Sequence, residues 1–189
     1  MFWTLFYDVD FHVILNLVSD GDDLLLGISI IFGGEEMLLK NVIKSEMVIL
    51  DLNAKNRNDA IEELVDLLYN EGYIIDKKEF NESVCYREGL ASTYCGFELA
   101  IPHGISKTVK KPGVCFGRTT GIDWDGDGET QVKYIFLIAI PYDENNKDES
   151  NKHIKILSSI ASLGLKDKIR EKWSKVETEE EFLKTLHEI

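Results

Sequence analysis

Cysteine and proline are scarce in this sequence, with three of each among 189 residues. The three cysteines are odd in number and form neither a Cys-x-x-Cys pair nor a zinc-ligand spacing. This pattern predicts free thiols in a protein of the reducing cytoplasm and gives no reason to expect a metal or a disulfide. No P-loop sequence is present, so direct use of ATP is not expected.

Basic residues are also few, because 21 Lys and Arg stand against 34 Asp and Glu and give a formal net charge of −13. A strongly acidic chain is not expected to bind nucleic acid or an anionic membrane surface. Residues 1–36 contain no Lys or Arg but seven acids. They therefore lack the positive start of a secretory signal, and three aspartates between positions 20 and 23 make their apolar run too short to span a membrane.

The origin of residues 1–36 has two interpretations. In the first interpretation they are a genuine N-terminal extension, whose alternating apolar residues could add one or two strands. Alternatively they are a leader read through in frame, because codons for Gly33-Gly34-Glu35-Glu36 can spell a ribosome-binding site just before Met37. In either case residues 37–189 form one domain of ordinary size, with no internal repeats and no second catalytic domain.

The pattern of residues 37–189 predicts alternating strands and helices. Strands are expected at 47–52, 99–101, 114–118 and 132–140, and the last is apolar enough to be a central strand covered on both faces. Asn58 or Asp59 is expected to cap the start of a helix that runs through Asn70, and Asp76 with Glu79 is expected to cap a second helix. The fold class expected is α/β, a single domain with a mixed central sheet flanked by helices on both faces.

The C-terminal part predicts three more helices. The first begins near Ser150 or Asn151 and turns Ile154, Leu157 and Ile160 inward, with His153 in its first turn. Two short helices follow, and the last of them begins with the capping box Thr178-Glu-Glu-Glu181.

An aspartate-rich turn, Asp123-Trp-Asp-Gly-Asp-Gly128, begins like a calcium-binding loop. The position that needs a bidentate glutamate is Tyr134, so the match fails and no metal is expected. A polar hairpin turn is the preferred interpretation.

Chemistry is indicated by a histidine that follows a short apolar strand in the sequence Leu99-Ala-Ile-Pro-His103-Gly104. Proline restricts the backbone before His103, and Gly104 has no Cβ, so we expect an imidazole on a rigid strand end that another molecule can approach. Such a histidine suits nucleophilic or phosphoryl-transfer chemistry. The alternative is a polar residue that only ends a buried strand.

A second unusual residue is Arg87, which ends an otherwise apolar stripe on the predicted second helix. A guanidinium buried on that stripe needs an anionic partner.

Taken together, these motifs resemble a known family. Arg87-Glu88, Ser92-Thr93, Gly96 and Ala100-Ile-Pro-His-Gly104 resemble the active-site signature of type-2 enzyme IIA domains of the bacterial phosphoenolpyruvate:sugar phosphotransferase system. The resemblance extends from Met37 to the end of the chain. It is nearest to the fructose type within the fructose–mannitol group. One departure is Glu98, where many members have glycine.

The resemblance implies a cytoplasmic phosphotransferase that needs no cofactor. His103 would accept a phosphoryl group from HPr as a tele-phosphohistidine and pass it to a cysteine of enzyme IIB, which serves a membrane IIC component. Arg87 would balance the phosphate charge, and His153 would stabilise or orient the phosphoryl group. Thr93 and Ser92 are weaker candidates for a hydroxyl contact. A second function remains open, in which phosphorylation of His103 regulates binding to a target protein.

Overall fold

The computed structural model describes residues 42–142 and 147–186, with side chains in the fourth helix described from residue 154 onward. Both interpretations of residues 1–36 concern a segment outside the described residues. They stay predictions here, and the fold below is that of the part of the chain with described structure.

A five-stranded mixed sheet forms the centre of the fold, in the order β1-β4-β5-β2, with β3 also paired to β5. β4 and β5 are antiparallel, whereas β1 runs parallel to β4, and β2 and β3 run parallel to β5. The strands are β1 (Val48–Ile49), β2 (Leu99–Ala100), β3 (His103–Ser106), β4 (Gly113–Asp123) and β5 (Gln131–Pro141). The predicted central strand is confirmed, because β5 pairs with three other strands and is almost wholly buried.

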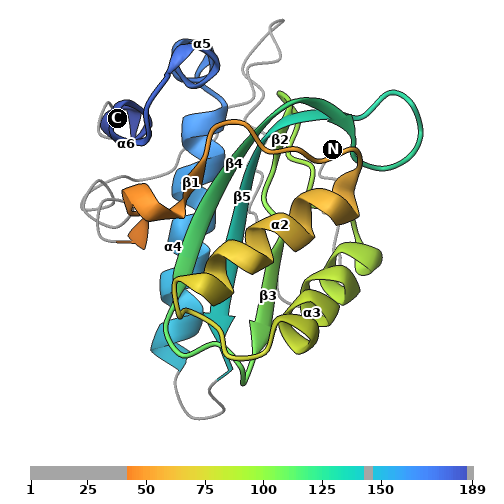
Figure 1. Cartoon of the computed structure of the whole chain (residues 1–189), viewed down its shortest axis with the longest axis vertical. Helices are drawn as coiled ribbons and strands as arrows, with labels where there is room; N and C mark the ends of the chain where they lie inside the picture. The colour runs from red at the N-terminus through yellow and green to blue at the C-terminus, as the bar shows by residue number, and fades with distance from the viewer. Residues whose placement is uncertain (1–41, 143–146, 187–189) are drawn as a thin grey trace, which may run out of the picture. The chain divides into compact units, whose positions relative to one another are not determined.

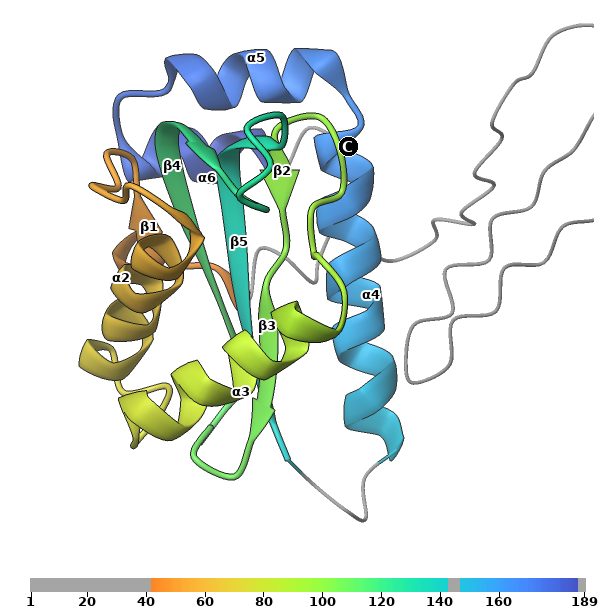
Figure 2. The ribbon, with the colours of Figure 1, turned by 90° about the vertical axis from the view of Figure 1, so that its right-hand side faces the viewer.

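Helices cover both faces of this sheet, as the α/β prediction requires (Figures 1 and 2). The first two helices lie on one face and α4 lies on the opposite face, while α5 and α6 lie at the upper end of the sheet (Figure 2). A short 3₁₀ turn, η1 (Ser45–Met47), precedes β1. The helices are α2 (Arg57–Asn70), α3 (Lys77–Leu90), α4 (Lys147–Gly164), α5 (Asp167–Lys175) and α6 (Glu179–Thr185).

Two predicted helix starts are wrong. α2 begins at Arg57 rather than at Asn58 or Asp59, because the side chain of Asn56 accepts the amide N–H of Asp59 and caps the helix. α4 begins at Lys147, before Ser150 and Asn151. In contrast, the predicted caps of α3 and α6 are confirmed, since Asp76 accepts the amide of Glu79 and Thr178 that of Glu181.

The helix α4 also shows where periodicity alone misled the prediction. Leu157 and Ile160 are buried as expected, but Ile154 is 44% exposed. Ile154 lies in the first half of α4, where the packing that buries the later residues of the same stripe does not cover it.

The aspartate-rich turn is a hairpin loop between β4 and β5, and the hairpin interpretation is confirmed. β4 is longer than the predicted strand 114–118, because pairing resumes at Ile122 after an irregularity that follows Arg118. Asp123 accepts the amides of Gly126 and Gly128, and Asp127 accepts those of Glu129 and Thr130. These carboxylates therefore hold the loop's own backbone.

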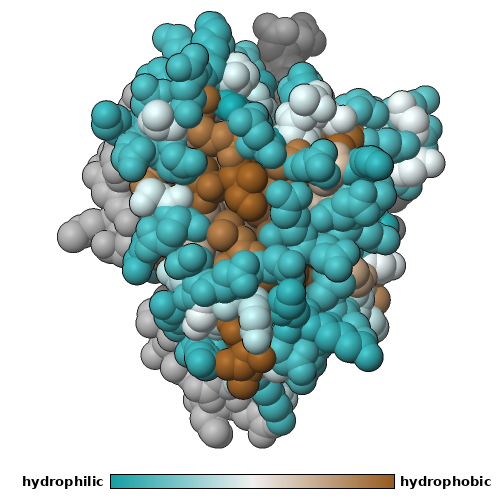
Figure 3. Space-filling model, viewed as in Figure 1, coloured by the Kyte–Doolittle hydropathy of each residue, from teal (hydrophilic) through white to brown (hydrophobic). Residues whose placement is uncertain are grey.

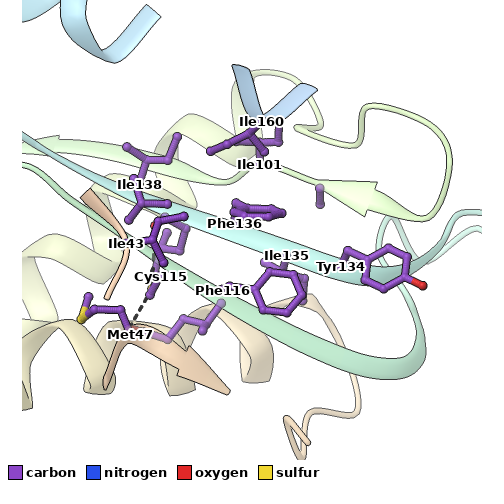
Figure 4. Close-up of a cluster of buried hydrophobic side chains, with 14 of the residues drawn as sticks. Ile43, Met47, Ile101, Cys115, Phe116, Tyr134, Ile135, Phe136, Ile138 and Ile160 are labelled. Carbon is purple, nitrogen blue, oxygen red and sulfur yellow. Dashed lines mark hydrogen bonds between the residues drawn. The ribbon is translucent and has the colours of Figure 1, made fainter. Parts of the chain in front are cut away.

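An aromatic cluster joins the sheet to the C-terminal helices. The rings of Phe116 on β4 and Phe182 on α6 are stacked with centroids 3.9 Å apart, and Trp173 of α5 lies within 6.0 Å of Phe116. Phe136 of β5 packs in the same cluster, and Figure 4 shows it among other buried side chains of the core. Burial of these large rings fixes α5 and α6 on the sheet.

The surface seen in Figure 3 is largely hydrophilic. An apolar patch interrupts it over β1 and β4, between α2 and α6 (Figure 3). The edge of the sheet is thus only partly covered on this face, and the candidate site described next is built from other elements.

Candidate functional site

His103 lies at a break between two short strands that pair with the same neighbour. β2 and β3 both run parallel to β5, and Ile101 and Pro102 separate them. The expectation that His103 ends a strand is therefore wrong, because it is the first residue of β3 and pairs with Ile138. The interruption leaves the carbonyl oxygen of Ile101 free of the strand ladder and near the imidazole.

Gly104 does not provide access for another molecule, as the sequence suggested. A Cβ at this position would lie 2.5 Å from Ser83 Oγ and 2.8 Å from Val84 Cγ2 of α3. The missing side chain therefore lets α3 pack closely on β3. Since neighbouring residues of a strand point to opposite faces, His103 faces away from this contact, towards the face that α4 covers.

The imidazole of His103 is held through both ring nitrogens. Nδ1 lies 3.0 Å from the carbonyl oxygen of Ile101, and Nε2 lies 3.0 Å from Nε of Arg87. A carbonyl can only accept and an arginine Nε–H can only donate, so this pattern selects the tautomer with the proton on Nδ1 and the lone pair on Nε2. His103 is buried, with 6% of its surface exposed, rather than open in front.

Arg87 reaches His103 from the last turn of α3. Besides its contact with the imidazole, it donates from Nη1 to the carbonyl oxygen of Ala91 at 2.9 Å, which fixes the guanidinium at the C-terminal end of the helix. The predicted pair of Arg87 and His103 is therefore brought together. The guanidinium is half-buried and donates to a ring nitrogen. An anionic group could take the place of this nitrogen as the acceptor of that hydrogen bond.

Glu88 is a buried residue of the site region for which the sequence motif predicts no role of its own. Only 4% of it is exposed, and its carboxylate accepts the amide and the hydroxyl of Thr93 and the indole N–H of Trp124. The sequence signal for Glu88 is its place next to Arg87 in the motif. Its hydrogen-bond partners lie 5 and 36 residues away along the chain, so the motif does not reveal them.

The hydroxyl groups proposed as weaker phosphate contacts are occupied by carboxylates. Thr93 Oγ1 donates to Glu88 at 2.7 Å, and Ser92 Oγ donates to Asp125 of the β4–β5 hairpin loop at 3.1 Å. Arg57 also contacts Asp125, at 3.4 Å. The segment after α3 is thus fixed to the hairpin loop and to α2.

His153 lies on α4, but its side chain is outside the described residues. Because α4 begins at Lys147, His153 is in the second turn rather than the first. The positive end of the helix dipole helps an anion less there, since that effect is concentrated in the first turn.

Glu98 occupies a backbone conformation that explains the preference for glycine at this position. Its φ angle is +61°, and Phe97 before it has a φ angle of +56°. Both are in the left-handed region, which costs an L residue free energy that glycine avoids. The carboxylate pairs with Lys133 at 2.6 Å on the surface, so it does not reach His103.

All three thiols are poor nucleophiles in this structure. Burial raises the pKa of Cys95 to about 11, and it also raises the pKa of Cys85 and of Cys115. Cys95 donates its S–H to the carbonyl oxygen of Thr93. Thiolates carry the reactivity of cysteine, so none of the three is prepared for attack.

A metal-binding cluster and a membrane-spanning helix are both absent from the described residues. Among residues 42–142 and 147–186, no group of three or more His, Cys, Asp or Glu side chains is placed to hold a metal ion. In the same ranges, no helix is both long enough and apolar enough to cross a bilayer.

Comparison with known families gives a match over most of the chain. The family described as "Phosphoenolpyruvate-dependent sugar phosphotransferase system, EIIA 2" matches residues 41–189. The matched segment contains every residue of the site described above.

Individual relatives include fructose- and mannitol-specific components. A mannitol-specific phosphotransferase enzyme IIA component of Geobacillus stearothermophilus is 34% identical over 152 residues, which are 78% of this chain and 97% of that protein. A fructose-specific EIIABC component of Bacillus subtilis is 28% identical over 81% of this chain. This chain spans only 23% of the length of that larger protein.

Solved structures with the same fold include IIA proteins of two kinds. Nitrogen regulatory protein IIA-Ntr of Neisseria meningitidis aligns with a TM-score of 0.70 and 27% identity, over 79% of this chain and 99% of that one. The Escherichia coli complex of enzyme IIAMTL and phosphorylated enzyme IIBMTL aligns with a TM-score of 0.65 and 24% identity, over 76% and 96%. At that identity the second likeness concerns the fold alone.

Proposed function

Because this chain belongs to the EIIA 2 family of the phosphoenolpyruvate-dependent sugar phosphotransferase system, we propose that it carries a phosphoryl group on Nε2 of His103. The donor is phospho-HPr and the acceptor is a cysteine of an enzyme IIB, in a fructose-type system of the cytoplasm. The observation that carries this proposal is the pair of hydrogen bonds that leaves the lone pair of His103 on Nε2, beside Arg87.

Transfer begins with a change at Arg87. In the resting state its Nε–H occupies the lone pair of Nε2, so this hydrogen bond must break before the nitrogen attacks phosphorus. Phosphoryl oxygens are stronger acceptors for a guanidinium than a neutral ring nitrogen, because both partners are then charged. The arriving phosphoryl group therefore draws Arg87 from the ring to the oxygens and frees the nucleophile.

The chemical step then needs positioning more than covalent help. The bond from Nε2 to phosphorus forms as the bond from phosphorus to the donor nitrogen breaks, and the donor ring leaves with the electron pair. The proton on Nδ1 of His103 stays in its hydrogen bond to Ile101, which supports the positive charge that develops on the ring. His153 is proposed to stabilise the bound phosphoryl group from α4.

Exposed apolar side chains near this pair support docking of a protein donor and acceptor. Tyr86 and Leu90 flank Arg87 on α3 and are 72% and 63% exposed, and Ile105 lies two residues after His103 and is 46% exposed. Large apolar residues this exposed are typical of surfaces that bind partners. A donor that covers them would also exclude water from the transfer.

A regulatory role is the second candidate, and one observation favours it. The structure of nitrogen regulatory protein IIA-Ntr aligns with almost its whole length on this chain. In that role the state of His103 would control binding to a target protein, with the same chemistry at the ring. Transfer onward to an enzyme IIB separates the two candidates, because only the carrier role requires it.

The test is phosphorylation of the whole chain by phosphoenolpyruvate, enzyme I and HPr, followed by intact mass measurement. We expect one added phosphate that acid removes and base retains, and none in His103→Ala. His187→Ala, which changes a histidine outside the motif, is the matched control and should be labelled normally. Labelling of His103→Ala would refute the proposal, as would a folded wild-type chain that accepts no phosphate.

Two additions extend the same assay. His153→Ala should still be labelled, but more slowly in both directions, and unchanged rates would remove His153 from the site. Adding fructose-type or mannitol-type IIB should discharge the phosphoprotein, with the fructose-type protein faster. A phosphoprotein that discharges to neither would contradict the carrier role and support the regulatory one.

A further inference from the structure

The buried carboxylate of Glu88 has no part in the chemistry proposed above, yet it lies next to Arg87 in the last turn of α3. It accepts three hydrogen bonds, from Thr93 N at 2.9 Å, Thr93 Oγ1 at 2.7 Å and Trp124 Nε1 at 2.8 Å. Arg57 Nη1 lies 4.0 Å from the same carboxylate. Burying a carboxylate is costly unless donors surround it, so this position is strongly specified by its neighbours.

A continuous series of hydrogen bonds leads from Glu88 to the imidazole. Glu88 holds the amide and the hydroxyl of Thr93. The carbonyl oxygen of Thr93 accepts the amide of Ile101 at 3.1 Å. The carbonyl oxygen of Ile101 in turn faces Nδ1 of His103 at 3.0 Å. Arg87 and Glu88 thus hold the two sides of the same ring, one directly and one through Thr93 and Ile101.

The position of Ile101 matters because it decides which nitrogen of His103 can attack. Neutral imidazole has two tautomers, and the hydrogen bond at one nitrogen selects which of them is present. Ile101 and Pro102 lie in the gap between β2 and β3, so the sheet ladder alone does not fix the carbonyl of Ile101. The carbonyl of Pro102 accepts the amide of Ile138 on β5. The contact of Ile101 with Thr93 adds a second restraint, and Glu88 in turn restrains Thr93.

We propose that Glu88 is a positioning residue which, through Thr93 and Ile101, keeps the proton of His103 on Nδ1 and the nucleophilic lone pair on Nε2. This inference rests on the proposed function for its effect on phosphoryl transfer. Its effect on the tautomer is a property of the resting protein. The two can therefore be tested apart.

The experiment compares three variants by the ¹⁵N chemical shifts of the His103 ring, at a pH where the ring is neutral, and by phosphorylation kinetics with phospho-HPr. Glu88→Ala removes the acceptor. Glu88→Gln keeps the size and, with the Thr93 hydroxyl turned to accept, can keep the three contacts. Glu79→Gln is the matched control, because Glu79 also lies on α3 and accepts a hydrogen bond from Ser106 of β3. This contact is not part of the series of hydrogen bonds that leads through Ile101 to His103.

We expect the wild type, Glu88→Gln and Glu79→Gln to show one protonated nitrogen, Nδ1. Glu88→Ala should show a mixture of tautomers. Its rate at saturating phospho-HPr should fall in proportion to the loss of the reactive tautomer, about twofold for an equal mixture. The concentration of HPr at half-maximal rate should not change, because the buried Glu88 does not touch the donor. Should Glu88→Ala not fold, Thr93→Val removes one of the same contacts isosterically and should shift the tautomers in the same direction.

Two results would overturn the inference. One is an unchanged tautomer in folded Glu88→Ala, or in Thr93→Val where that variant replaces it. The other is a mixture in Glu88→Gln equal to that in Glu88→Ala, which would assign the effect to charge. Failure of the wild type to accept phosphate would refute the proposed function alone, since the tautomer is measured without it.

Discussion

Arg87 and Arg118 are two partly buried arginines of this fold, and they make different kinds of contact. Arg118 on β4 donates to three backbone carbonyls, those of Leu50, Trp173 and Val176, at 2.8 to 2.9 Å. Arg87 on α3 donates to one backbone carbonyl and to the nitrogen of His103. The first joins fixed parts of the backbone, and the second joins a helix to a group that can change its chemical state.

This difference separates a structural arginine from a functional one. The acceptors of Arg118 are present throughout the life of the fold, so its hydrogen bonds contribute to stability. In the proposed function, the acceptor of Arg87 on His103 is lost when the nitrogen is phosphorylated, and the new phosphoryl oxygens then replace it. The sequence motif singles out Arg87 and not Arg118, and the acceptors of the two guanidinium groups show the physical difference.

The largest effect is expected from Arg87→Ala. The variant should fold normally, but phosphate acceptance should slow by about 10- to 150-fold, because a charge-assisted contact is worth about 1.5–3 kcal/mol. Single-turnover labelling by phospho-HPr measures it. A normal rate would show that Arg87 is structural like Arg118, and the comparison would fail.

The reverse result is expected from Arg118→Ala. Three carbonyls lose a charged donor, so the free energy of unfolding should fall by about 3 kcal/mol in denaturant titrations. The labelling rate of the folded fraction should stay at the wild-type value. If that rate falls as much as in Arg87→Ala, the two arginines have no separate roles.

Gly104→Ala tests the contact that brings α3, and with it Arg87, against the strand of His103. The new Cβ would meet Ser83 and Val84 well inside van der Waals distance, so we expect a loss of about 1–3 kcal/mol and slower labelling. Gly89→Ala on the same helix is the control, because its Cβ would meet nothing within 4 Å. It should stabilise the protein by about 0.5–1 kcal/mol, and equal losses in both variants would refute this account.

The smallest effect on stability is expected at Asp127 in the β4–β5 hairpin loop, away from the contacts of Arg87 and Arg118 described above. The amides of Thr130 and Glu129 hold the pKa of this carboxyl below its usual value of 3.8. Its stabilising contribution is therefore complete above that pH and is lost as the pH falls through the lowered value. The protection factor of the Thr130 amide, which is corrected for the intrinsic pH dependence of exchange, should fall only under those acidic conditions. A protection factor that already falls near neutral pH would contradict the assignment.

Much of the fold could be predicted from the sequence, because apolar periodicity and caps are local signals. The central strand β5 and the caps Asp76 and Thr178 are confirmed. The errors lie where a distant contact decides the outcome. Gly104 was interpreted as open to a partner molecule, whereas α3, at the other side of the 91–98 segment, occupies that space.

The site shows the same limit. The motif predicted Arg87 and His103 as functional residues, and the structure brings these two together. The motif includes Glu88 but does not predict what this residue does. The role of Glu88 depends on contacts with Thr93 and Trp124 that form only in the folded chain. The side chain of His153 lies outside the described residues, so its contribution stays a prediction.

The central claim is that the lone pair of Nε2, beside Arg87, accepts the phosphoryl group. The most direct measurement is NMR of ¹⁵N-histidine-labelled protein after phosphorylation, where coupling to phosphorus identifies the bonded nitrogen. The account predicts a single phosphorylated nitrogen, Nε2 of His103, with the proton retained on Nδ1. Phosphorus on Nδ1 of His103, or on any other residue, would contradict it.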